Sequence, residues 1–524
     1  MRRSLAVVAV LLGVSPFVAA HGPEDSVKNL VGNVTFPISC EAKVQSAFET
    51  AVAMLHSYWF PEADKAFKAV LKDDPQCAMA YWGLAVNLMG NMLSAPPSMK
   101  DANTAQEMVA KARAAGAKTQ RERDWIESVA AYYLDHDKVP ATKRLGAYSA
   151  ALERMSAAYP DDIEVATFHA LALQGSAPST DVTYANQRKA GEILEKIVAK
   201  YPQHPGAAHY LIHAYDYPPL AEKGLAAARK YASIAPAAPH ARHMPSHIYS
   251  MLGYWEDSIA SNKSALQVQP DYIHAIDFIV YAQMQLGQEK QALEMIAEGD
   301  RQYAAKPPGT TGGYTAKAVM AARHAMERGD WKAAAELPVM NSIMAQADSL
   351  RRFARGIGMA RSGDAAGARA EVEAMKALRE KLEKANQGYW AARTDEQMFA
   401  VSAWAALADG DKAQAEKLMR AAADGEDGSI KHVALENRLY PLRELYADLL
   451  LEAGQPAKAL AEYEAAIRSY PNRFRALYGA ALAANAAGDR TKAAGYAQRV
   501  MAMSGKADGP RPEVQRMRQV VARQ

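Results

Sequence analysis

The chain has 524 residues, of which 50% are hydrophobic, 23% are charged and 8% are aromatic. A chain of this length can form several ordinary domains or one long repeat array, and this mixture suits packed helices with small residues at their contacts. Its formal net charge is only +3. Because nucleic-acid binding needs a concentrated basic surface, we expect no nucleic-acid partner.

The first 20 residues have the pattern of a cleaved secretory signal. A basic start precedes an apolar run from Leu5 to Val14, and small residues follow at Val18, Ala19 and Ala20. The run is shorter than the roughly 20 apolar residues of a membrane anchor. We therefore predict cleavage after Ala20, a periplasmic or secreted protein, and no membrane span after cleavage.

The only two cysteines are Cys40 and Cys77. In a chain that we expect to be exported, a disulfide is the default for such a pair. The bond would tie an irregular lead-in, predicted at residues 21–43, to the start of the second helix pair.

From residue 44 the sequence alternates helical segments with short turns marked by Pro, Gly and Asp. Less regular helix pairs come first, and three regular repeats then start near Pro205, Pro239 and Ile273. Each start lies 34 residues after the one before it. A loop of sequence KPPGTTGG interrupts the pattern at residues 306–313.

The period and its punctuation resemble the tetratricopeptide repeat family. In the repeat 239–272, Tyr249 and Gly253 close the first helix, Ala265 lies in the second, and Pro270 ends it. The motifs HMPSHIY, LGYWEDSI and PNRFRALYGAA are similar to a group of large exported members of this family, which implies fold and export but no reaction. The resemblance implies an all-α, TPR-like α-solenoid of about 11–12 helix pairs in two lobes. The predicted units are an N-terminal array with a histidine-lined groove at 44–305, the loop at 306–313, a C-terminal array at 314–505 and a capping helix at 506–524.

Histidine is concentrated in one part of the chain, because seven of the 13 histidines fall within residues 204–274. His209 and His213 are four residues apart, His243 and His247 are also four apart, and the second pair follows the first by 34 residues. Residues four apart share one helix face. Each pair can therefore aim two ring nitrogens at one point.

In the tetratricopeptide family, the side chains at repeat positions 2, 5 and 9 face the concave groove. Positions 5 and 9 of the regular repeats hold His209, His213, His243 and His247, and Asp277 occupies position 5 of the third repeat. Imidazole and carboxylate ligands suit several transition metals. We predict that the four histidines bind one ion, zinc or copper in preference and iron as an alternative, with Asp277 completing the shell or orienting a histidine. The additional groove candidates are His240, His274, Tyr281 and Glu164.

Three functions fit these residues. The first is an exported binding scaffold whose groove holds the metal and recognises a protein, a peptide or a small ligand. The second is a metal-dependent periplasmic enzyme, hydrolytic or oxidative, in which Glu164, Asp277 or a groove tyrosine carries protons. The third is a metal-free peptide-binding scaffold, since polar groove residues are routine in this family.

Overall fold

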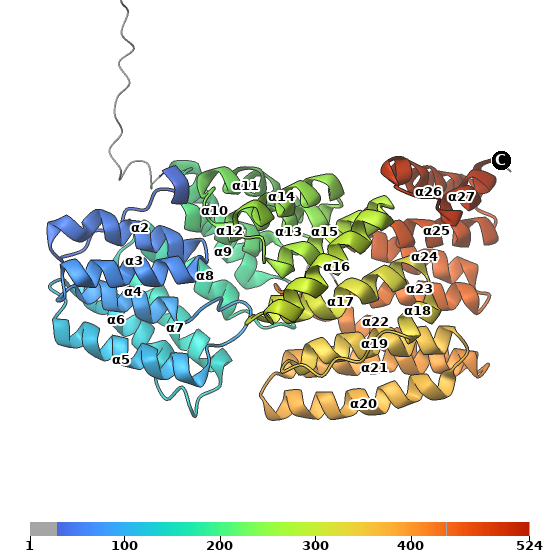
Figure 1. Cartoon of the computed structure of the whole chain (residues 1–524), viewed down its shortest axis with the longest axis horizontal. Coiled ribbons are helices and arrows are strands. Elements are labelled where there is room, and N and C mark those ends of the chain that lie inside the picture. Colours follow the sequence, from blue (N-terminus) through green and yellow to red (C-terminus); the bar gives the residue numbers. More distant parts are fainter. Residues whose placement is uncertain (1–28, 436–437, 523–524) are drawn as a thin grey trace, which may run out of the picture.

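The computed structural model describes residues 29–435 and 438–522, so the predicted signal segment lies outside the described residues. From Ala42 onward the described chain folds into 26 α-helices and two short 3-10 helices, and it contains no strand. The prediction of an all-α solenoid is therefore confirmed. The helices stack in chain order, and the N-terminal and C-terminal halves lie side by side (Figure 1).

Helices in the first part of the chain pack mainly against their neighbours in sequence, because short turns join them. Their bounds are η1 (Ala42–Val44), α2 (Gln45–His56), α3 (Phe60–Asp73), α4 (Ala78–Asn87), α5 (Met99–Ala115), α6 (Gln120–Tyr133), α7 (Ala141–Ala158), α8 (Ile163–Gly175), α9 (Ala185–Lys200), α10 (Pro205–Tyr215), α11 (Ala221–Ile234), α12 (Pro239–His243), α13 (Pro245–Leu252), α14 (Trp255–Val268), α15 (Ile273–Leu286) and α16 (Glu289–Ala305).

The second part of the chain continues the same arrangement after a short connection. Its helices are α17 (Thr311–Arg328), α18 (Trp331–Ala335), α19 (Ala345–Arg361), α20 (Ala365–Lys384), α21 (Gly388–Ala408), α22 (Lys412–Asp427), α23 (Leu442–Glu452), α24 (Pro456–Ser469), α25 (Phe474–Ala486), α26 (Arg490–Met503), η2 (Ser504–Lys506) and α27 (Pro512–Ala522).

The three regular repeats begin at the positions that the sequence predicts, Pro205, Pro239 and Ile273. Proline suits the first position of a helix, because the N–H that it lacks would have no partner there. Gly253 and Gly287, also 34 residues apart, follow the first helices of two repeats with φ of 72° and 74°. This left-handed conformation is easiest for glycine and stops the helix.

The first helix of the middle repeat is interrupted, although the sequence predicts it as continuous. Pro245 has no N–H to donate to the preceding turn, so the helix divides into α12 and α13. Met244 between them keeps helical angles, with φ of −53° and ψ of −35°. The chain direction is therefore preserved across the break, and His243 and His247 stay on one face.

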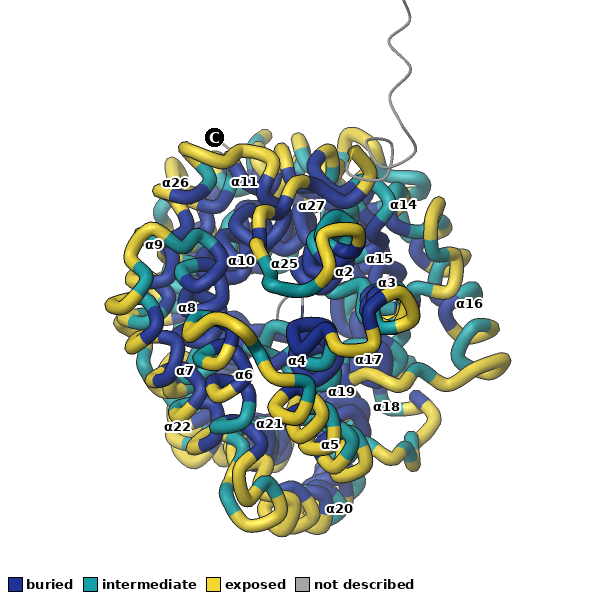
Figure 2. The backbone as a smooth tube through the Cα atoms, turned by 90° about the vertical axis from the view of Figure 1, so that its left-hand side faces the viewer, coloured by how far each residue is buried: buried dark blue, intermediate teal, exposed yellow. Residues whose placement is uncertain are grey.

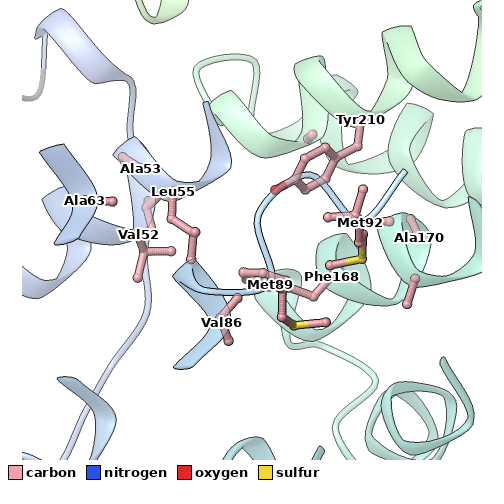
Figure 3. Close-up of a cluster of buried hydrophobic side chains, with 14 of the residues drawn as sticks. Val52, Ala53, Leu55, Ala63, Val86, Met89, Met92, Phe168, Ala170 and Tyr210 are labelled. Atoms are coloured by element: carbon pink, nitrogen blue, oxygen red, sulfur yellow. The ribbon is translucent and has the colours of Figure 1, made fainter. Parts of the chain in front are cut away.

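The hydrophobic core consists of two large clusters, one within residues 31–252 and one within residues 314–520. Two smaller clusters join α14, α15, α16 and α17 between them. Seen from one end, the buried positions face the inside of the stacked helices and the exposed positions face outward (Figure 2). Figure 3 shows part of the first cluster, with side chains that include Leu55 of α2, Phe168 of α8 and Tyr210 of α10.

Cys40 and Cys77 form a disulfide with an S–S distance of 2.09 Å. Cys40 lies in the lead-in and Cys77 directly precedes α4, so the bond links the two segments that the sequence predicts. Within the described part of the chain, none of the helices combines the length and the apolar character needed to cross a bilayer.

Candidate metal centre

Six histidine side chains from the three regular repeats form one contiguous cluster. Neighbouring imidazole rings lie 4.8 to 6.2 Å apart between centroids. The four histidines predicted as ligands are between 0% and 2% exposed, so they are enclosed instead of lining an open groove. The members are His209, His213, His240, His243, His247 and His274.

Two segments from outside the three repeats enclose the cluster. Tyr58, two residues after the end of α2, stacks on His240 with ring centroids 5.2 Å apart and meets His209 edge-on at 4.5 Å. The second segment is residues 429–435, between α22 and α23, which we call the bridging segment. It is anchored to the first half of the chain, because Ile430 N–H donates to the carbonyl of Ser179 at 2.9 Å.

The structure sorts the six histidines into two triads, which corrects the expectation that four of them converge on one point. Within each triad, one ligand atom from each residue lies within 4.8 Å of the others. Each triad combines the histidines at positions 5 and 9 of one repeat with the position 2 histidine of the next repeat, which lies at the start of the neighbouring helix. Triad A is His209, His213 and His240, and triad B is His243, His247 and His274.

The proton of His243 is fixed by the amide of Asn262. Asn262 Nδ2 donates to the carbonyl of Ser258 at 2.8 Å, so Asn262 Oδ1 is the atom that faces His243. This oxygen lies 2.6 Å from His243 Nδ1, which must carry the proton and donate it. In the neutral ring, His243 Nε2 therefore holds a lone pair.

The position of the ring proton of His247 is fixed in the same way, by a carboxylate. Its Nδ1 donates to Asp216 Oδ2 at 2.8 Å, so its Nε2 also holds a lone pair. Lys431 of the bridging segment donates to the same Asp216 oxygen at 2.9 Å and to the carbonyl of Leu435 at 2.7 Å. Burial raises the pKa of Asp216 and lowers the pKa of Lys431, and their contact opposes both shifts.

The Nε2 atoms of His243 and His247 are 3.1 Å apart, although both hold lone pairs. Two nitrogen ligands bound to one ion at about 2.0 to 2.1 Å would be about 3.3 Å apart in a tetrahedron and about 2.9 Å apart at a right angle. The observed separation lies between these values. The pair therefore fits a shared transition metal, and a carboxylate that orients a metal-binding histidine is a common supporting contact.

Triad A has a similar arrangement. His209 Nδ1 donates to the carbonyl of His56 at 2.6 Å, and His209 Nε2 lies 3.0 Å from His240 Nε2. His240 Nδ1 lies 3.1 Å from the hydroxyl of Tyr272. Neither ring nitrogen of His213 has a hydrogen-bonding partner among the described residues, although the side chain is 2% exposed.

Burial keeps all six rings neutral at ordinary pH, because a buried imidazolium loses its hydration. It lowers the pKa of His243 to about 4. It also lowers the pKa values of the other five histidines well below the usual value, and neighbouring histidines add to that effect. Neutral imidazole is the form that binds metals.

A third group, His56, Glu164 and His204, differs because its hydrogen bonds are complete. Ala207 N–H donates to His204 Nδ1 at 3.1 Å, so His204 Nε2 carries the proton that it donates to Glu164 at 2.9 Å. His56 Nε2 lies 2.8 Å from the other Glu164 oxygen, and His56 Nδ1 lies 3.0 Å from the hydroxyl of Tyr210. These rings have no lone pair left for a metal, so the group is a structural connection between α2, α8 and α10.

Two further candidates, Asp277 and Tyr281, lie in neither triad. Asp277 is buried, and its carboxylate is 4.0 Å from the guanidinium of Arg323. Tyr281 accepts a hydrogen bond from Arg473 at 2.9 Å and packs on Trp255. The 34-residue period places Asp277 and Tyr281 at repeat positions 5 and 9, in register with the histidines. Their surroundings, however, are determined by arginine side chains from α17 and from the start of α25.

The sequence interpretation missed four residues that position the histidines. Asp216 follows α10 directly and Asn262 lies in α14, which the repeat pattern treats as an outer helix. His56 and Lys431 come from distant parts of the chain. Only the polarity of Asp216 and Asn262, close in sequence to the histidines, could have indicated a role.

A family comparison identifies the repeat class in the second part of the chain. Residues 446–508, from within α23 to just beyond η2, match a family model described as tetratricopeptide repeat. The chain carries tetratricopeptide repeats. Solenoids built from such repeats present extended surfaces that bind other molecules. The histidine repeats lie outside the matched residues, and a search of curated proteins finds no match.

Three solved structures are similar to this tetratricopeptide repeat chain at low identity. The structure of Naa15/Naa10 bound to HypK-THB is 14% identical, covers 91% of this chain and 73% of its own, and has a TM-score of 0.25. The APC/C hetero-tetramer Cut9-Hcn1 is 11% identical, with coverages of 91% and 89% and a TM-score of 0.33. A tetratricopeptide repeat protein from Parabacteroides merdae ATCC 43184 is 13% identical, with coverages of 64% and 97% and a TM-score of 0.27.

Proposed function

We propose that this chain is an exported tetratricopeptide repeat protein that binds a transition-metal ion, zinc or copper, through His243, His247 and His274. One observation carries the proposal. The Nε2 atoms of His243 and His247 are 3.1 Å apart, and each ring has its only proton on Nδ1, where a fixed oxygen accepts it. Two neutral rings held in this way repel each other unless a cation lies between their lone pairs.

A shared proton is the competing explanation for the short contact. It would join only His243 and His247. It would also leave His274 without a role, although its ring lies 4.8 Å from that of His243 between centroids. A metal ion engages all three side chains, and its preference for nitrogen donors favours zinc and copper.

Export rests on two observations. Residues 1–20 have the order of a secretory signal, and the Cys40–Cys77 disulfide is typical of an oxidising compartment. N-terminal sequencing of the mature protein tests this part of the proposal. A chain that begins at His21 supports export, and a chain that keeps residues 1–20 in an exporting host contradicts it.

The metal proposal is tested with untagged protein that is loaded with Zn²⁺ or Cu²⁺, desalted and measured by elemental analysis. We expect the wild type to retain metal and the double variant His243→Gln, His247→Gln to retain at least one equivalent less. His136→Gln, in a histidine outside all three groups, is the control. If the double variant misfolds, His274→Gln replaces it, because His274 Nδ1 has no hydrogen-bonding partner to lose among the described residues. Equal metal in wild type and folded variants would exclude this site.

An azide titration of the same protein distinguishes a closed binding site from a catalytic site. Three protein ligands leave a fourth tetrahedral position, which catalytic zinc sites keep open for water or substrate. Azide that perturbs the absorption spectrum of the Co²⁺-substituted protein would favour the enzyme. A spectrum that azide does not change would favour a closed binding site.

A further inference from the structure

Triad A repeats the arrangement of triad B in the neighbouring repeat. Each triad takes two histidines from the first helix of one repeat and one from the start of the next repeat. All three members are displaced by one 34-residue period. The corresponding pairs are His209 with His243, His213 with His247, and His240 with His274.

In triad A, His209 and His213 each hold a lone pair that an ion could engage. The carbonyl of His56 fixes the proton of His209 on Nδ1, so the lone pair of Nε2 points at His240 Nε2, 3.0 Å away. His213 is buried with both ring nitrogens unpartnered among the described residues. Leaving a buried polar group without a partner is costly, and a metal ion would engage one of these nitrogens.

The motif occurs in these two repeats and is absent from the neighbouring ones. One period earlier, Gly206 occupies position 2, and a side-chain atom there would lie 2.5 Å from His56 Nδ1. One period later, Asp277 and Tyr281 occupy positions 5 and 9 and contact arginines instead of histidines. The three-histidine motif is therefore confined to two consecutive positions in the repeat array.

We propose that triad A is a second transition-metal site and that the two triads together form a two-metal centre, with three imidazole ligands for each ion. The inference rests on the proposed function of triad B. The rings of His213 and His247, one from each triad, are 6.2 Å apart between centroids, and those of His240 and His243 are 5.9 Å apart. Two bound ions would thus be close neighbours. Such a pair suits a small ligand that bridges two metals, such as hydroxide or azide.

The experiment compares two matched double variants with the wild type, using Cu²⁺ or Zn²⁺ alone as the probe. One variant is His209→Gln, His213→Gln, and the other is its 34-residue counterpart His243→Gln, His247→Gln. We expect two equivalents of metal in the wild type and one in each variant. With Cu²⁺ bound, we expect the electron paramagnetic resonance signal of the wild type to be broadened or weakened by coupling and that of each variant to be an isolated ion.

The outcomes separate this inference from the proposed function. A wild type that binds one equivalent, and keeps it in the triad A variant, overturns the second site and leaves triad B standing. A wild type that binds two equivalents and also keeps two in the triad A variant places the second ion elsewhere and likewise overturns the inference. A wild type that binds no metal overturns both. If the triad A double variant does not fold, His240→Gln tests the same site, because His240 is partly exposed and tolerates substitution better.

Discussion

Lys431 Nζ lies 2.9 Å from Asp216 Oδ2, and the same carboxylate oxygen accepts the hydrogen bond from His247 Nδ1 at 2.8 Å. The two residues are 215 positions apart in the sequence, and both side chains are 1% exposed. The bridging segment therefore reaches the proposed metal ligands from the C-terminal half of the chain. The position of one histidine depends on how the two halves of the solenoid meet.

We expect Lys431→Met to weaken metal binding by triad B. Methionine has a similar length but no charge, so Asp216 would lose its cationic partner and hold His247 less firmly. Substitution of residues that orient metal ligands typically lowers metal affinity about 10-fold to 100-fold. Competition with a chromophoric zinc chelator measures the change. Lys458→Met, at an exposed ion pair with Glu416, is the control. An affinity of Lys431→Met within about twofold of the wild type would contradict the positioning role.

Gly206→Ala should disturb triad A through its contact with His56. The added Cβ would lie 2.5 Å from His56 Nδ1, and this ring is held by Glu164 and Tyr210. Overpacking of this kind typically costs about 1 to 3 kcal/mol of stability. Because the carbonyl of His56 fixes the proton of His209, metal binding at triad A should weaken as well.

Thermal denaturation and metal titration of the Gly206 variant test this expectation. Gly146→Ala is the matched control, because the added methyl group in α7 meets no atom within 4 Å. Alanine in an open helical position should raise stability slightly, by up to about 1 kcal/mol. Equal behaviour of the two variants would show that the contact with His56 has no consequence.

The repeat period made the scaffold predictable from sequence. Proline at the first helical position and glycine at the helix end are local signals, so the starts at Pro205 and Pro239 follow from residues within one turn. The contacts of His56 and Lys431 follow from no local signal. They join residues 153 and 215 positions apart, and they depend on how the whole array curves.

The histidine rows were also predictable, but their grouping was not. The period places His243 and Asp277 at the same repeat position, position 5. In the structure they have different partners, because Arg323 of α17 faces Asp277. The third member of each triad comes from position 2 of the next repeat. The position of this third histidine depends on the offset between neighbouring helices. That offset cannot be read from the residue spacing within one helix.

The disulfide should stabilise the N-terminal end of the array. It joins residues 37 positions apart, and Cys77 is fully buried at the start of α4. In the chain-entropy treatment, a loop of this length contributes about 4 kcal/mol. We expect the double variant Cys40→Ala, Cys77→Ala to melt at lower temperature and to be cut faster by protease near residues 32–60. Reductant should lower the melting temperature of the wild type and leave that of this variant unchanged. Without reductant, an identical melting temperature in both proteins would contradict the expectation.

Glu164→Gln should destabilise the protein in a way that depends on pH. Burial alone would raise the pKa of Glu164, but His204 and His56 hold it down at about 2, against an ordinary value of 4.5. A lowered carboxyl pKa contributes stability above pH 4.5, and the contribution is lost as the pH falls from 4.5 towards 2. Glutamine cannot accept both histidine protons, so we expect the variant to lose about 3 kcal/mol near neutral pH. Denaturant unfolding at pH 7 and at pH 3 measures both proteins, and the gap between them should narrow at the lower pH. A gap of the same size at both values would show that the charge of Glu164 does not stabilise the fold.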